Sequence, residues 1–182
     1  MVARMVVSAG SGGPFDLING IPVHPLVVHA AVVLVPLTAL GLIAMAIWPR
    51  FSARYGWLVV ASGVVAAVSS FAAKESGEAL EDRLTEPGFD HAELGELMPI
   101  FAGVLLIAVV GLWLIDRSTP AEGPAPRRGL RIAVAVVGVV IALGNLLWVY
   151  RVGDSGAKSV WSGKVAASES QGGSGDGDED SD

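Results

Sequence analysis

The chain of 182 residues contains no cysteine. Disulfide bonds, thiolate metal sites, cysteine-ligated iron–sulfur clusters and covalently attached c-type haem are therefore excluded. Charged residues make up only 16% of the sequence and hydrophobic residues 52%, which is typical of a membrane protein and not of an ordinary soluble domain. The sequence also lacks a basic patch or stripe, so nothing predicts a nucleic-acid partner.

The short motifs that mark common active sites are also missing. The sequence has no HExxH zinc motif, no Walker phosphate loop and no GxSxG nucleophile motif. The glycine-rich residues 10–13 precede no strand–helix unit and so do not form a phosphate loop. The residues therefore indicate no enzyme class.

Long apolar segments dominate what is present. About 20 apolar residues in a helix cross the hydrocarbon core of a bilayer, and four segments are of about this length: residues 21–48, 57–73, 97–115 and 130–150. The sequence predicts an all-α integral membrane protein with four transmembrane helices in an antiparallel bundle. We expect a flexible lead over residues 1–20, a membrane domain over 21–161 and a disordered acidic tail over 162–182.

Several local features are expected from proline and from capping residues. Pro25 should open the first span, which leaves His24 outside the helix body. Residues 50–55 read as a short basic turn, and Gly and Ala residues in the second span favour close packing against other helices. Asp90 is a plausible N-cap of a third helix that continues through residues 97–115.

The distribution of arginine predicts the orientation. The connections after spans one and three are short and place arginines close to the span ends, where the positive-inside bias is strongest. We therefore place these connections in the cytoplasm and both termini outside. Spans one and three then start on the same outer side. All three histidines of the chain, His24, His29 and His91, gather there with the carboxylates that follow span two.

Three chemistries could use this cluster. Haem b could bind between His29 and His91, which open two spans running in the same direction. A transition-metal ion could take His24, His29, His91 and Glu78, because imidazole and carboxylate groups suit zinc, iron and manganese. Alternatively, a histidine–carboxylate group could relay protons without a cofactor. Asp154, at the end of the fourth span, is a candidate to orient an imidazole.

The opening segment GIPVHPLVVHAAVVLVPL resembles the bacterial membrane family catalogued as domain-of-unknown-function family 2231, whose members begin with a similar G-x-P-x-HP-x-x-VH run. SGEALEDRL followed by HAELGELMP is similar to the actinobacterial branch of that family, and RVGDSGAKSVW resembles its closing segment. The resemblance covers residues 20–161. It implies four spans, a bacterial cell membrane and no established activity, and it attaches haem binding to the histidines as a suggestion. The family's closing segment commonly has histidine where this chain has Asp154.

The sequence thus favours a multi-pass membrane protein with a haem- or metal-binding site at its extracytoplasmic end, in an accessory redox role. His29 and His91 are the expected ligands. His24, Glu78 and Asp154 are candidates for a third ligand or for groups that orient the imidazoles. Its partners would be the lipid bilayer and other membrane or redox proteins. The alternative is a cofactor-free structural or assembly subunit whose second span packs against partner helices. Transport is a weaker third hypothesis, because no half-helices flank a charged site at mid-membrane.

Overall fold

The computed structural model describes residues 17–18, 21–81, 89–118 and 125–172 of the chain. Within these residues, four helical segments are long and apolar enough to cross a membrane, namely Leu26–Ile47, Pro49–Glu78, Glu93–Ser118 and Arg128–Lys158. They belong to α1 (Val23–Ile47), α2 (Pro49–Glu81), α3 (Phe89–Glu96) with α4 (Met98–Ser118), and α5 (Ala125–Gly172). The predicted fold class, an all-α four-span membrane protein, is confirmed.

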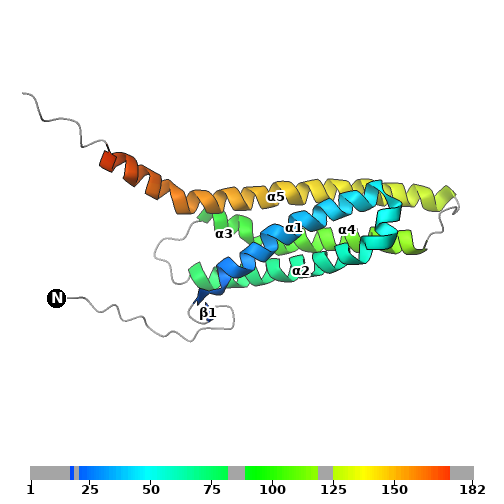
Figure 1. Cartoon of the computed structure of the whole chain (residues 1–182), viewed down its shortest axis with the longest axis horizontal. Coiled ribbons are helices and arrows are strands. Elements are labelled where there is room, and N and C mark those ends of the chain that lie inside the picture. The colour runs from blue at the N-terminus through cyan, green and yellow to red at the C-terminus, as the bar shows by residue number, and fades with distance from the viewer. Residues whose placement is uncertain (1–16, 19–20, 82–88, 119–124, 173–182) are drawn as a thin grey trace, which may run out of the picture.

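The spanning helices form a closed ring (Figure 1). α1 packs against α2 and α5, and α4 packs against the same two neighbours from the other side. Consecutive spans run in opposite directions, so each end of the bundle gathers parts of every span. The start of α1, the end of α2 and α3 share one end, which we call the histidine end. The end of α1, the start of α2, the end of α4 and the start of α5 share the other, the arginine end.

Two prolines set the helix boundaries. Pro49 begins α2 directly after Trp48, because its missing N–H ends one helix and is tolerated at the start of the next. Residues 50–55 are therefore helical, and the prediction of a basic turn there is wrong. Pro99 has no N–H to offer the carbonyl of Gly95, so the third helix breaks at Leu97 into α3 and α4.

The helix starts and the tail also differ from expectation. α1 begins at Val23, which places His24 inside the helix, and α3 begins at Phe89, one residue before the predicted cap. Before α1, strands β1 (Leu17–Ile18) and β2 (Ile21–Pro22) form a two-residue antiparallel pair within the expected lead and its border. α5 continues to Gly172, beyond the boundary predicted at residue 161. An established helix propagates readily into residues such as KVAASESQ, most of which carry little helix penalty.

Small residues of α2 allow its close packing inside the bundle. A Cβ at Gly56 would lie 2.3 Å from Cδ1 of Trp113, and one at Gly63 would lie 3.1 Å from a methyl carbon of Leu106. Ala66, which lies between these contacts and the end of α2, is also buried. Gly56, Gly63 and Ala66 of span two therefore pack inside the bundle of the same chain, and the packing of span two against partner helices stays a prediction.

The outside of the bundle is apolar. Large hydrophobic side chains are exposed on every spanning helix, for example Val33, Val68, Ile107 and Val140, which are 62%, 64%, 72% and 65% exposed. Exposed apolar surface of this extent is unfavourable in water and favourable against lipid acyl chains. The outer surface thus matches the membrane location that the sequence predicts.

Candidate functional site

His24 is held by α2 at the histidine end. Its Nδ1 lies 3.0 Å from the carbonyl oxygen of Ala73 and 3.2 Å from Oγ of Ser76. Oγ of Ser76 also donates to the Ala73 carbonyl, at 3.1 Å. Gly77 makes this approach possible, because a Cβ there would lie 3.1 Å from Cε1 of the imidazole. The ring is half-buried between α1 and α2.

The hydrogen bonds of His24 fix its tautomer. A carbonyl oxygen can only accept, so the proton must be on Nδ1, which donates to Ala73 and to Ser76. In a neutral ring the lone pair is then on Nε2. Histidines that bind metals are commonly oriented in this way, with one ring N–H donating to a backbone carbonyl.

The other two histidines are placed differently. His29 is exposed, on the same side of α1 as the exposed Val32 and Val33, whereas the half-buried His24 lies against α2. His24 is therefore the more buried of these two imidazoles within the bundle. The physical reason is the helical start of α1, which turns His24 toward the bundle. His91 lies in α3 at the same end of the bundle (Figure 1), but its side chain lies outside the described residues, so its approach to His29 stays a prediction.

The two candidate carboxylates, Glu78 and Asp154, each form an ion pair with a lysine of the same helix. Lys74 donates to Glu78 one turn further along α2, and Nζ of Lys158 lies 2.6 Å from Oδ2 of Asp154 on α5. These i,i+4 pairs are typical of exposed helical surfaces. Among the residues with described side chains, no group of three histidine, aspartate or glutamate residues is placed to hold a metal ion.

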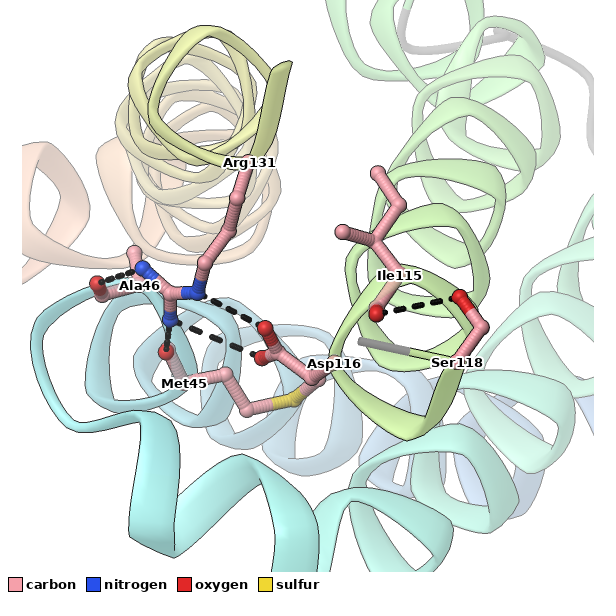
Figure 2. A network of polar contacts seen from close by, with 6 residues as sticks. All are labelled: Met45, Ala46, Ile115, Asp116, Ser118 and Arg131. Carbon is pink, nitrogen blue, oxygen red and sulfur yellow. Dashed lines mark hydrogen bonds and ion pairs between the residues drawn. The ribbon is translucent and has the colours of Figure 1, made fainter. Parts of the chain in front are cut away.

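A second polar network closes the arginine end, and no sequence motif marks it (Figure 2). Nε of Arg131 on α5 donates to Oδ1 of Asp116 on α4, at 2.7 Å. Its Nη2 donates to the carbonyl of Met45 at 3.0 Å, and Nη1 to that of Ala46 at 3.4 Å. These carbonyls end α1 and have no partner within their own helix. One guanidinium therefore joins three helices.

Between the two ends the interior carries isolated polar groups. Thr38 on α1 and Ser62 on α2 share a hydrogen bond of 2.9 Å across the bundle. Asn145 on α5 is 2% exposed and donates to the carbonyl of Ile141, while its Oδ1 has no hydrogen-bond partner among the described residues. These groups lie among apolar core side chains such as Val35 and Leu105.

Comparison with known proteins places this arrangement in a family. The family model described as a predicted membrane protein, DUF2231, matches residues 20–169 of the chain, which include all four spans. The chain belongs to the DUF2231 family. No curated protein and no solved structure matches it. The DUF2231 match does not test the resemblance to an actinobacterial branch, which stays a prediction.

In this DUF2231 protein, the candidate residues at the histidine end differ in the contacts that their side chains make. The elements that carry His24, His29, His91, Glu78 and Asp154 meet at one end, as predicted. His24 is oriented by another helix, whereas Glu78 and Asp154 pair within their own helices. The signal that sequence reasoning missed is the Ser76–Gly77 pair, which offers a hydroxyl and space beside the ring.

Proposed function

We propose that this DUF2231 protein binds haem b or a transition-metal ion at its histidine end and serves an accessory redox role in the membrane. The observation that supports this proposal is the fixed ring of His24, whose Nδ1 donates to the Ala73 carbonyl. That hydrogen bond orients the imidazole in the way that backbone carbonyls orient metal-binding histidines. A bound haem or a redox-active ion such as iron would supply one-electron transfer, whereas zinc would not.

The candidate residues differ in how well they are placed to bind haem or a metal ion. His24 fits best, because its ring is oriented before any ligand arrives. His91 is the next candidate, because α3 carries it to the same end. His29 stays a candidate from an exposed face of α1. Glu78 could bind an ion only by exchanging its contact with Lys74, and Asp154 would orient an imidazole only by leaving Lys158.

A cofactor-free structural or assembly role is the second candidate, and one observation favours it. Two polar contacts at the histidine end hold helices of the chain together. The ring of His24 joins α1 to α2. Nε1 of Trp148 donates to the carbonyl of Leu94 at 3.2 Å and so joins α5 to α3. Under this alternative, partner membrane helices would contact the exposed apolar face of the bundle.

The experiment that separates the two candidates uses the full chain purified in mild detergent. Haem b gives a Soret band in the absorption spectrum, and elemental analysis measures bound metal ions. The proposal expects one of these in stoichiometric amount. If the protein is colourless and metal-free even after expression with added haem precursor and metal salts, the cofactor-free role replaces it.

We also propose that both termini are extracytoplasmic in a bacterial cell membrane. The support is the charge of the two ends. The arginine end exposes Arg50, Arg54, Arg117 and Arg128, and its buried acid Asp116 is paired with Arg131. The basic residues with described side chains near the histidine end are Lys74, Arg151 and Lys158. The positive-inside bias then assigns the arginine end to the cytoplasm.

A further inference from the structure

Arginine and tryptophan side chains meet where α2 begins and α4 ends. Arg117, in the last turn of α4, places its Cζ 4.7 Å from the centre of the Trp113 ring. Trp113 in turn packs against Gly56 of α2, where only the missing Cβ leaves room for the indole. Arg117 is therefore positioned beside the contact line between α2 and α4, with its guanidinium exposed.

Arg50 and Trp57 lie on α2 within about two helical turns of Gly56. They are seven residues apart and so share one face of the helix. Val59, which meets Gly41 of α1, lies on the opposite side of Gly56. At about 100° per residue, Trp57 lies about 100° and Arg50 about 120° around α2 from Gly56, on the side away from Val59 and on the exposed face of the helix. Arg50 is exposed and Trp57 is 57% exposed.

Acidic residues do not neutralise this group. Asp116 adjoins Arg117 in sequence, but its side chain is 4% exposed and bonded to Arg131. Within the part of the chain that the structure describes, neither Arg50 nor Arg117 takes part in an ion pair. Among the described residues, these two guanidinium groups thus face outward with no acidic partner, at the level where the spanning segments end.

We propose that Arg50, Trp57, Trp113 and Arg117 form a binding site for the headgroup of an anionic glycerophospholipid. Guanidinium groups match the geometry and charge of a phosphate diester, and basic pockets between transmembrane helices bind such headgroups. Tryptophan favours the interfacial level between headgroup and acyl chain. Below it, exposed Val64, Ile107 and Leu114 offer an apolar surface to the acyl chains. The site is independent of the histidine end and of the function proposed for it.

Lipid binding to the full chain in detergent tests the site. Native mass spectrometry would measure the affinity of the wild type for cardiolipin, phosphatidylglycerol and phosphatidylcholine. We expect the two anionic lipids to bind more tightly than phosphatidylcholine. The double variant Arg50→Gln, Arg117→Gln should bind cardiolipin about 30-fold more weakly, which corresponds to about 2 kcal/mol for two arginines near an anionic surface. Both side chains are exposed, so the variant should fold normally.

A matched control removes two positive charges from the other end of the bundle. Arg151 and Lys158 are exposed on α5 near the histidine end. The variant Arg151→Gln, Lys158→Gln should keep the wild-type affinity for cardiolipin. If this control loses as much affinity as the arginine-end variant, binding depends on net charge alone and the site is refuted. Equal binding of phosphatidylcholine, or unchanged cardiolipin binding in the arginine-end variant, also overturns the proposal.

Discussion

The network at the arginine end offers the sharpest test of how the bundle is held together. The change is Asp116→Ala, which removes the carboxylate that accepts from Nε of Arg131 at 2.7 Å. The side chain of Asp116 is 4% exposed and that of Arg131 18% exposed. Removing one partner of a buried ion pair costs about 3–5 kcal/mol. Because Arg131 reaches the end of the bundle, we expect the lower part of that range, about 3 kcal/mol.

A double-mutant cycle isolates the interaction. Arg131→Met removes the ion pair and also the two bonds to the carbonyls of Met45 and Ala46, so it should cost at least as much as Asp116→Ala. The double variant should cost less than the two single variants together, because it leaves no unpaired charge. Unfolding by sodium dodecyl sulfate in mixed micelles, followed by circular dichroism, measures the free energies.

The control is Asp154→Ala, which removes an exposed acid that pairs with Lys158 on the surface of α5. Its free energy of unfolding should stay close to that of the wild type, because exposed pairs contribute little. The reasoning is refuted if Asp116→Ala stays within about 0.5 kcal/mol of the wild type, or if the single changes simply add.

Further predictions concern packing, orientation and the interior. Gly56→Ala should destabilise the bundle by about 1–3 kcal/mol, because the new methyl overlaps an indole ring; Gly103→Ala, with nothing within 4 Å, should be neutral or stabilising in the same unfolding assay. In intact cells an impermeant maleimide should label Glu93→Cys and leave Ala53→Cys unlabelled, both positions being exposed; the reverse pattern inverts the proposed topology. Thr38→Val should cost about 0.6 kcal/mol, the average for a hydrogen bond between membrane helices, and no measurable loss would show that the bond adds nothing.

The number of spans and their order follow from the sequence alone. Apolar length decides them, because a backbone in lipid must satisfy its own hydrogen bonds and so forms helices. The same topology brings the elements bearing His24, His29 and His91 to one end. Helix boundaries were harder to predict, because the effect of a single proline on a helix depends on its position. At Pro49 two helices meet almost without a turn, whereas Pro99 divides one expected helix into two.

The orientation of side chains could not be predicted in the same way. His24 and His29 are five residues apart and so lie about 140° apart around α1. Only the packing of α1 against α2 decides that His24 is the one that faces α2. The partner of His24 is a backbone carbonyl, which no sequence pattern marks. Arg131 is likewise only one of several arginines in the sequence around the connection between the third and fourth spans. Its role depends on Asp116 and on the end of α1, which are remote in sequence and close only in the folded bundle.

The central functional claim is that His24 is an oriented ligand, and ligand titration of histidine variants tests it most directly. Purified protein freed of cofactor would be titrated with haemin and, separately, with Zn²⁺, using wild type, His24→Ala, Ser76→Ala and His29→Ala. We expect His24→Ala to abolish binding of the ligand that the wild type takes. Ser76→Ala should weaken it about 10-fold, as changes to the groups that orient a ligand do, and His29→Ala should weaken it less than His24→Ala. Unchanged affinity in His24→Ala, or no binding of either probe by the wild type, would contradict the account.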